Sequence, residues 1–502
     1  MITRLLVVVT AIGALGAWAL ASPVGSDPDG QFHLSSIWCG SGYAAAKCEP
    51  PLPGSESLVP KAVRVPTGVA FAGTCHSYKS DYSASCETVL LDNRELIQTQ
   101  FNNEGRLYPN LYYFVASKFV GNDIARSALT IRLLNLLLLI FLVTAMYRIT
   151  PKDIRDGVAI TLLAFMIPLG LFLVASNNGS SWTISGVSVY WAFFVTFLTA
   201  SEKARWIPAG LLSLASGFMA LGSRADGAIY IVFSTVVALL IALGRNPAAL
   251  RKYWFRSFAG VFICLAAGVS YFSSGQSGSL TGGLFGDGGF GRAPAETLFN
   301  NFSRLPALYM GALGARGAVG DLGWLDTAMP EMVSGFALFT AGGIILYSRK
   351  KRSAAELLAV LVCIAALITT PLAMLQMDGA IVGELVQARY VLPLLLLAAG
   401  VFASGERVGS AEFLSPSTRI LFPALMTVAY SVALHTTMRR YITGNDVMGW
   451  NLNSNREWWW QNGPPPMTIW FIGTACFAYV VVSIFRHVGK VPISGGVTAN
   501  EE

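Results

Sequence analysis

Charged residues are scarce in this sequence. Only 13% of the 502 residues are charged, whereas 54% are hydrophobic, and the mean hydropathy is +0.55. A soluble protein of this length needs many more charged side chains on its surface. The scarcity excludes an ordinary soluble protein and indicates that lipid is the solvent for most of the chain.

The sequence also lacks the signals of a nucleotide or nucleic-acid partner. Its formal net charge is +7, but Lys and Arg gather in short segments between apolar runs, where they normally set membrane topology. We therefore expect no nucleic-acid partner. The glycine-rich run Gly275–Arg292 lacks the Lys-Ser/Thr ending of a phosphate-binding loop. For this run the alternatives are a mobile flap over a site and a disordered segment.

Cysteine is infrequent and unevenly placed. Three of the seven cysteines lie inside apolar runs, and the other four, Cys39, Cys48, Cys75 and Cys86, share one polar segment. Four thiols in one polar segment are typical of disulfides in an oxidising compartment. Three connectivities are open, and the close spacing favours Cys39–Cys48 and Cys75–Cys86.

Long apolar runs are what the sequence has in abundance. The first covers residues 4–22 and ends in Ala-Leu-Ala-Ser, which also fits a signal-peptide cleavage site, so a secreted N-terminus is the alternative to an uncleaved first helix. Eleven more runs cover about 127–147, 157–175, 183–200, 206–222, 228–244, 257–273, 329–348, 354–374, 388–404, 417–435 and 466–485. About 20 apolar residues cross the roughly 30 Å hydrocarbon core. The runs predict an all-α polytopic membrane protein with about 12 transmembrane helices.

The segment 109–121 decides on which side the later loops lie. It is apolar but, at about 1.5 Å per residue, too short to cross the bilayer. If it does not span, most Lys and Arg residues fall in cytoplasmic segments, as the positive-inside rule requires. We therefore expect an interfacial or re-entrant helix at 109–121 and both termini in the cytoplasm.

The runs and the polar segments between them predict five parts. These are a first transmembrane helix (1–22), an outer loop with the disulfides and interfacial helices (23–126), a transmembrane bundle (127–273), a glycine-rich outer loop (274–328) and a C-terminal bundle (329–502) with an outer loop at 436–463 and a short cytoplasmic tail. The last outer loop carries Trp458, Trp459 and Trp460. These tryptophans are expected to anchor a helix end among the lipid headgroups, with stacking on a sugar as the alternative.

Two carboxylates follow the first apolar run directly. Asp27 and Asp29 flank Pro28, and His33 comes four residues after the second carboxylate. Ionisable residues at a membrane face are costly unless they are paired or used. The aspartates can cap a short helix that begins near Gly30, or one can act as a general base. The two interpretations are compatible.

Three motifs in the chain resemble those of one family. Pro28–His33 resembles the Pro-Asp-Glu-x-x-His signature of domain-of-unknown-function family 2142, bacterial membrane proteins that look like GT-C glycosyltransferases. Tyr108–Tyr113 resembles the family's Pro-Pro-Leu-Tyr-Tyr, and Gln387–Pro393 resembles its Gly-Arg-Tyr-x-x-Pro. The sequence departs from the pattern at Gly30, where the family has glutamate, and at Asn110, where it has a second proline.

The resemblance implies a GT-C-like fold and a polyprenyl-phosphate-sugar-dependent glycosyltransferase. Such an enzyme would lie in a bacterial plasma membrane and would transfer the sugar, with inversion, to an envelope glycan or a lipid-linked acceptor at the outer membrane face. Asp29 takes the role of general base, and Asp27 is the substitute for the glutamate missing at Gly30. The leaving polyprenyl phosphate already bears negative charge, so it needs cations more than an acid.

The candidates for the donor phosphate are Arg224, Arg389 and His33, because arginine can meet two phosphate oxygens at once. Each has a structural alternative. Arg224 can form an ion pair with Asp226, Arg389 can snorkel or pair with Glu384, and His33 can lie on a helix surface without a role.

By resemblance, the substrate groove contains Tyr112, Tyr113, Tyr390, Gln387 and Asp226. On physical grounds alone the two adjacent tyrosines are interface aromatics. The sequence establishes no cofactor. A divalent ion on the two motif aspartates and the histidine is an open alternative that would need water or donor oxygens to complete its coordination.

Two other classes of function compete with the enzyme. The first is a transporter or flippase of a lipid-linked sugar, which also needs about a dozen helices. Transporters usually place charges near the bilayer midplane, and the middles of these runs contain few. The second is a non-catalytic scaffold for envelope assembly, which would leave the aspartates and arginines without a common purpose.

Overall fold

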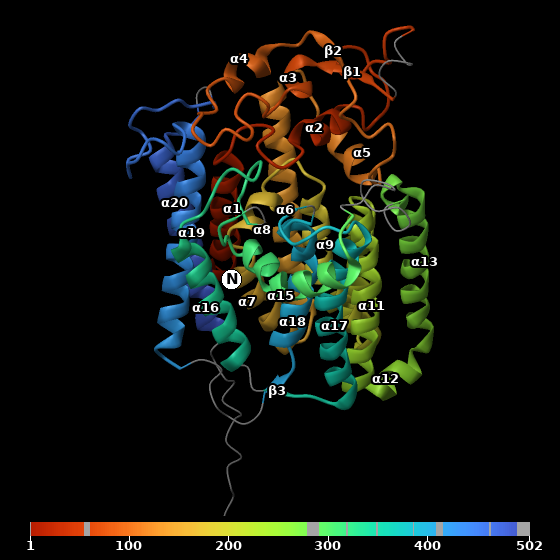
Figure 1. Cartoon of the computed structure of the whole chain (residues 1–502). Coiled ribbons are helices and arrows are strands. Elements are labelled where there is room, and N and C mark those ends of the chain that lie inside the picture. Colours follow the sequence, from red (N-terminus) through yellow and green to blue (C-terminus); the bar gives the residue numbers. More distant parts are fainter. Residues whose placement is uncertain are drawn as a thin grey trace, which may run out of the picture.

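The computed structural model describes residues 2–54, 61–278, 291–317, 320–347, 350–384, 386–407, 415–460 and 463–488. The described part is mostly helical. Long helices form a bundle, and the segment between the first and second long helices covers one end of it (Figure 1). We call the described residues of this covering segment, 23–123, the crown.

Eight helices in the described ranges are long and apolar enough to cross a membrane. They are α6 (Ile124–Ile149), α9 (Ser180–Thr199), α10 (Lys203–Leu221), α11 (Ala225–Arg245), α13 (Ser257–Ser273) with the preceding 3-10 turn η1 (Trp254–Arg256), α17 (Ala354–Met377), α19 (Thr418–Ile442) and α20 (Pro466–Val488). Three further apolar helical stretches are shorter: Arg4–Leu20 in α1 (Ile2–Leu20), Glu331–Leu346 in α16 (Glu331–Tyr347), and α18 (Ala388–Ala403). The prediction of a helical membrane protein is confirmed in this coarse form.

The predicted count of about 12 spans is not confirmed. The expected run 157–175 is divided into α7 (Lys152–Phe165) and α8 (Leu169–Val174), with Pro168 between them. Proline lacks a backbone N–H and disfavours a helical conformation in the residue before it, which explains the break. Neither piece reaches the roughly 20 residues that a span needs.

Helix α9 occupies the centre of the bundle. Almost all of its side chains are buried, and it packs against α6, α10, α11 and α18. A helix that is buried on every side needs no charged face, which agrees with the absence of charged residues from Ser180–Thr199. Helix α9 is therefore the helix around which its four neighbours pack.

The crown consists of short elements held by disulfides. Its elements are α2 (Gly30–Trp38), β1 (Val63–Pro66), α3 (Thr67–Ala70), α4 (Glu87–Asp92), β2 (Leu96–Thr99) and α5 (Leu111–Ser117), with β1 and β2 antiparallel. Disulfides Cys39–Cys48 and Cys75–Cys86 are formed, which confirms the favoured pairing. Helix α5 is about 10 Å long at 1.5 Å per residue. The segment 109–121 is thus too short to span, as expected.

The predicted glycine-rich loop contains a helix that the sequence analysis missed. Helix α15 (Pro294–Ala312) packs against α17 and α18. Its hydrophobic residues are interrupted by polar ones such as Asn300 and Arg304, so no continuous apolar run indicates it. A short 3-10 turn, η2 (Gly275–Gly278), follows α13, and most of the glycine-rich run, 279–290, lies outside the described residues.

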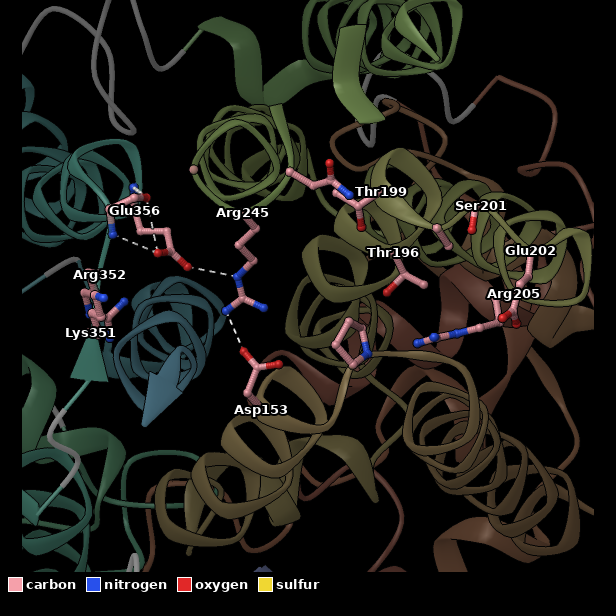
Figure 2. Close-up of a pocket in the computed structure, with 15 residues that line it drawn as sticks. Asp153, Thr196, Thr199, Ser201, Glu202, Arg205, Arg245, Lys351, Arg352 and Glu356 are labelled. Atoms are coloured by element: carbon pink, nitrogen blue, oxygen red, sulfur yellow. Dashed lines mark hydrogen bonds and ion pairs between the residues drawn. The ribbon is translucent and has the colours of Figure 1, made fainter. Parts of the chain in front are cut away.

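A polar cavity of about 590 Å³ lies at the end of the bundle opposite to the crown. Helix α12 (Pro247–Lys252) and the paired strands β3 (Lys350–Lys351) and β4 (Glu406–Arg407) lie at this end. In the cavity Arg245 contacts Asp153 at 2.6 Å and Glu356 at 2.9 Å (Figure 2). This arginine ties α7, α11 and α17 together, and the residues of the three motifs do not line this cavity.

Candidate active site

The turn after α1 carries the first motif and is packed backbone against backbone. Gly25 adopts a φ of 75°, and a Cβ atom there would lie 2.5 Å from the carbonyl carbon of Ala72. Only glycine permits both the conformation and the close approach. Trp324 donates from Nε1 to the Gly25 carbonyl at 2.9 Å. The turn at Gly25 is therefore held between Ala72 of the crown and Trp324 in the loop that precedes α16.

Arg132 of α6 holds the same turn in place. Its guanidinium is fully buried and donates to the carbonyls of Ala19, Ser22 and Pro23 at 2.6–2.9 Å, and to Asn177 Oδ1 at 3.0 Å. The last carbonyls of a helix have no partner within the helix. Arg132 satisfies such carbonyls at the end of α1 and so sets the position at which Asp27 and Asp29 follow.

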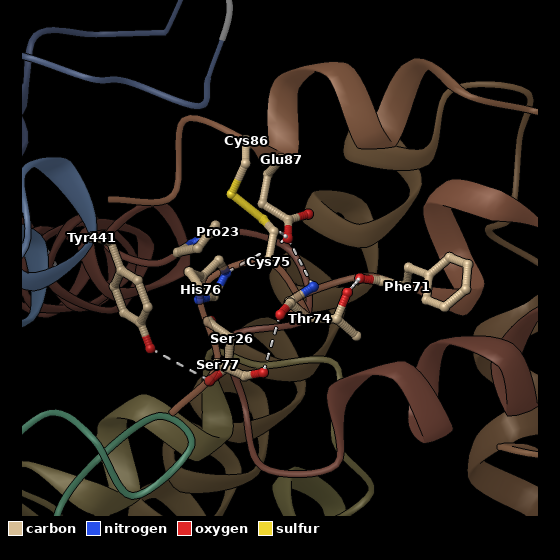
Figure 3. A network of polar contacts seen from close by, with 12 residues as sticks. Pro23, Ser26, Phe71, Thr74, Cys75, His76, Ser77, Cys86, Glu87 and Tyr441 are labelled. Atoms are coloured by element: carbon tan, nitrogen blue, oxygen red, sulfur yellow. Dashed lines mark hydrogen bonds and ion pairs between the residues drawn. A yellow bond between two sulfur atoms is a disulfide. The ribbon is translucent and has the colours of Figure 1, made fainter. Parts of the chain in front are cut away.

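A buried polar pair supports the crown beside this turn (Figure 3). Glu87 accepts from the Gly73 N–H at 2.8 Å, and His76 Nε2 lies 3.6 Å from the same Glu87 oxygen. Burial raises the pKa of Glu87 to about 8, and burial together with Arg440 lowers the pKa of His76 to about 3. Both side chains are thus mostly neutral near pH 7, and the pair acts as a packed polar contact.

Asp29 is the half-exposed carboxylate of the motif. Its side chain is 47% exposed, and its Oδ2 lies 2.8 Å from the Arg389 guanidinium, which is 4% exposed. Asp29 occupies the N-cap position of α2 with a φ of 61°, but its side chain makes no capping hydrogen bond. Burial raises the pKa of Asp29, but the charge and hydrogen bond of Arg389, together with the other basic groups nearby, outweigh this effect, so the net pKa lies below the ordinary value. The carboxylate is ionised and faces a cation.

Asp27 lies in a different environment from Asp29. Its side chain is fully buried, and within the described part of the chain neither carboxylate oxygen has a hydrogen-bond partner. Burial raises the pKa of Asp27 to about 6, against the charge of Arg132. Asp27 is enclosed behind the turn, whereas Asp29 reaches the surface of the site.

The two predicted arginines meet at one aromatic ring. The guanidinium carbons of Arg224 and Arg389 each lie 5.0 Å from the ring centre of Tyr390. Arg224 also pairs with Asp226, Nε to Oδ1 at 3.0 Å, so the alternative of a local ion pair is confirmed. Burial lowers the pKa of Arg224, but the charge and hydrogen bond of Asp226, together with the neighbouring Tyr108 and Tyr390, raise it well above its usual range.

The proposed alternative pair of Arg389 with Glu384 is wrong. Glu384 instead contacts Arg292 at 2.7 Å, and Arg389 turns inward to Asp29, the Tyr390 hydroxyl and the Pro28 carbonyl. A buried guanidinium is costly unless its charge is paired or its N–H groups are hydrogen-bonded, and Arg389 has both kinds of partner. The sequence distance of 360 residues between Asp29 and Arg389 concealed this partner.

His33 is buried, so its placement on a helix surface is wrong. Its Nδ1 lies 2.9 Å from the Tyr113 hydroxyl, and its ring packs between Tyr108 and Tyr113. Burial lowers the pKa of His33 to about 3, although the charge of Asp29 opposes the shift. A neutral imidazole brings no positive charge to a phosphate, so this geometry favours a packing role over phosphate binding.

The remaining predicted residues lie around this group. Tyr112 is buried in the core, where Asn135 Nδ2 lies 3.4 Å from its hydroxyl and its ring packs on Trp182. Gln387 precedes α18 and lines a small cavity together with Pro28 and Arg389. The structure thus brings Asp29, Arg389, Tyr390, Arg224, Asp226, His33 and Tyr113 together and leaves Asp27 and Tyr112 in the layer behind them.

Two residues of the site had no predicted role. Tyr108 contacts the ring of His33 and lies 5.4 Å from the Arg224 guanidinium, and Arg132 holds the motif turn. An ionisable residue inside an apolar run is itself a signal, because it is costly without a partner. Arg132 gives this signal, because it lies inside the apolar run 127–147. Tyr108 belongs to the motif Tyr108–Tyr113, but from the sequence it could not be distinguished from an interface aromatic.

The proposed metal set is not assembled. In the part of the chain that the structure describes, no group of three or more His, Cys, Asp and Glu side chains is placed to hold a metal ion. His33 directs its Nδ1 to the Tyr113 hydroxyl. The Asp27 side chain is fully buried, whereas the Asp29 side chain pairs with Arg389. The described residues therefore do not fit the divalent ion that was considered.

The apolar helices are those of a multi-pass membrane protein, and the Asp29–Arg389 pair marks a candidate site at the crown end of its bundle. A family of predicted membrane proteins, DUF2142, matches residues 12–398. The chain belongs to this family, as its three motifs predicted. Comparison with curated proteins and with solved structures gives no match.

Proposed function

We propose that this protein is an inverting glycosyltransferase of the GT-C type. It would move a sugar from a polyprenyl-phosphate donor to a hydroxyl of an envelope glycan or a lipid-linked acceptor, at the outer face of a bacterial plasma membrane. The observation that carries the proposal is the half-exposed carboxylate of Asp29, 2.8 Å from the buried guanidinium of Arg389. The transfer needs a base and a cation at one place.

Asp29 has the role of general base. Its carboxylate takes the proton of the acceptor hydroxyl while the hydroxyl oxygen attacks the anomeric carbon of the donor. The bond to the acceptor oxygen forms, and the bond from the anomeric carbon to the phosphate oxygen breaks. The electron pair leaves with the polyprenyl phosphate, and attack from the opposite side inverts the configuration. The low pKa of Asp29 keeps the base in its ionised form.

Arg389 and Arg224 have the role of the cations. Arginine binds phosphate with two parallel hydrogen bonds, and Tyr390 holds both guanidinium groups next to its ring. A donor phosphate bound to Arg389 would offset part of the positive charge that lowers the pKa of Asp29. The pKa of Asp29 would then rise, and Asp29 would be a stronger base when donor and acceptor are both present.

The position of the site supports a lipid-linked donor. Asp29 and Arg389 lie where the turn after α1 meets the start of α18, at the crown end of the apolar bundle. A lipid tail in the bilayer would present its phosphosugar at this depth. The crown carries two disulfides, which belong to an oxidising compartment. Both facts support an outward-facing site and cytoplasmic termini.

Asp29→Asn tests the proposal directly. We expect transfer by the purified protein in lipid nanodiscs, measured with a panel of radiolabelled polyprenyl-phosphate sugars and the host's envelope glycans, to fall at least about 100-fold because the base is lost. Thermal unfolding should still occur as one cooperative transition. The control is Glu384→Gln, which alters another carboxylate–arginine pair, with Arg292, and should keep its activity. Full transfer by Asp29→Asn would contradict the proposal.

A transporter or flippase of a lipid-linked sugar is the second candidate. The division of the predicted run into α7 and α8 favours it, because transporters often use discontinuous helices at their binding sites. Translocation of a fluorescent polyprenyl-phosphate sugar across proteoliposomes, without transfer to an acceptor, would support this candidate and argue against the enzyme.

A further inference from the structure

A second polar cavity, of about 380 Å³, opens in the crown beside the site. The end of α2, the segment before α5 and the end of α13 form its walls, with Ser36, Glu104, Arg106, Tyr108, Asn110 and Ser273 among the lining residues. Its volume is within the range of about 300–1,000 Å³ that small-molecule sites occupy. Three separate segments therefore build one hollow of the size of a ligand site.

Tyr108 is shared by this cavity and the candidate active site. Its ring lies 5.6 Å from the ring of His33 and 5.4 Å from the Arg224 guanidinium, while the residue also lines the cavity. Asn103 fixes the Tyr108 backbone with two hydrogen bonds, each 2.9 Å long. Tyr108 is thus a fixed aromatic residue that lines the cavity and also contacts the Arg224 side of the candidate active site.

The cavity offers polar groups that have no partner in the described chain. Among the described residues, neither the Arg106 guanidinium nor the Asn110 side-chain amide has a hydrogen-bond or ion-pair partner, and both side chains are exposed. Glu104 is exposed at the same rim. Guanidinium, amide and carboxylate groups together donate and accept several hydrogen bonds. Such a set suits a ligand that carries many hydroxyl groups.

The lining also excludes a lipid chain as the preferred occupant. An apolar cavity of about 160 Å³ lies elsewhere, among α1, α6, α7 and α20, and is lined by residues such as Val8, Leu139 and Phe477. The crown cavity has a mostly polar lining, which includes Cys39 of the disulfide Cys39–Cys48. A lipid chain and a hydrophilic partner would therefore favour different cavities of the molecule.

We infer that the crown cavity binds the hydroxyl-rich acceptor, a glycan, and that Tyr108 separates this acceptor subsite from the donor side with Arg224 and Arg389. The inference rests on the proposed function and specifies where the acceptor binds. The acceptor hydroxyl reaches Asp29 past Tyr108. Arg106 and Asn110 are then specificity-determining residues for the acceptor, and they play no part in donor binding.

Arg106→Ala and Asn110→Ala test this assignment, with Arg94→Ala as the matched control on another exposed arginine of the crown. The probe is an oligosaccharide mixture released from the host's envelope and labelled with a fluorophore. We expect each cavity variant to raise the KM for this acceptor about tenfold, which is the loss of one hydrogen bond. The kcat and the hydrolysis of donor without acceptor should not change, and Arg94→Ala should behave as the unmodified protein.

Three results would overturn the inference. An unchanged acceptor KM in both variants would show that the acceptor binds elsewhere, and a parallel fall in donor hydrolysis would assign the cavity to the donor. If the protein transfers no sugar at all, the proposed function fails, and fluorescence polarisation of the labelled oligosaccharide then tests the cavity alone. In that case weaker binding to Arg106→Ala supports a glycan site, and absent or equal binding removes it.

Discussion

Two aspartates two residues apart have different protonation behaviour. The positive charge of Arg389 lowers the pKa of Asp29 against the effect of burial, whereas burial raises the pKa of Asp27 to about 6. Only Asp29 combines exposure, charge and a cationic partner. The local environment, and not the residue type, therefore distinguishes the candidate base from the enclosed carboxylate.

At the residue scale, Arg389→Ala should change both donor use and pH dependence. Loss of a charge-assisted contact to phosphate should lower kcat/KM for the donor about 10- to 100-fold. Asp29 would also lose the charge that keeps its pKa low, so its pKa rises. The base is active when ionised, so the acidic limb of the pH–rate profile should move to higher pH.

The control for this prediction is Arg292→Ala, which removes the partner of Glu384. Kinetics across pH 4–9 with a radiolabelled donor measure both effects. An unmoved acidic limb in Arg389→Ala would mean that a group other than Asp29 is the base.

At the scale of elements, helix α6 positions the motif without carrying any of it. Arg132 extends from α6 to three carbonyls between Ala19 and Pro23. Its charge also opposes the rise in the pKa of the buried Asp27. The end of α1, the turn and the start of α2 therefore depend on one side chain from another helix.

Arg132→Met should therefore destabilise the protein strongly. The substitution leaves three carbonyls without their donor and Asp27 without its nearest opposing charge, at a cost of about 3–5 kcal/mol. The midpoint of thermal unfolding in nanodiscs, followed by tryptophan fluorescence, should fall clearly. Arg126→Met on the same helix breaks only an exposed pair with Asp123 and should leave the midpoint nearly unchanged. Equal midpoints for the two variants would refute the positioning role.

At the scale of the whole molecule, the two ends of the bundle differ in chemistry. One end has the crown with its disulfides and the Asp29–Arg389 pair. The opposite end has Arg245 between Asp153 and Glu356, and the strand Lys350–Lys351. This asymmetry is what a fixed orientation in a membrane with two different sides would require.

Cysteine labelling tests the orientation. Met448→Cys lies in the loop after α19, where the side chain is 95% exposed, and Glu202→Cys lies in the exposed segment before α10 at the opposite end. A membrane-impermeant maleimide should label the first variant in intact cells and the second only after permeabilisation. The unmodified protein with its three free cysteines is the blank. The reverse labelling pattern would place the site on the cytoplasmic face.

Composition and local pattern were sufficient for the class of protein and for several parts of it. Long apolar runs require helices in lipid, because an unpaired backbone is too costly there. Close spacing led to the two disulfide pairs, and three short motifs led to the family. These properties depend on neighbours in sequence or on composition, so they can be read without a fold.

Contacts over long sequence distances depended on the packing of the helices. Asp29 and Arg389 are 360 residues apart, Arg224 and Arg389 contact the same ring, that of Tyr390, and Arg132 reaches back more than 100 residues to α1. Burial then set the charge of His33 and Asp27, which no local pattern contains. A pKa and an ion pair depend on which side chains the folded chain brings within a few ångströms, and only the tertiary structure determines that.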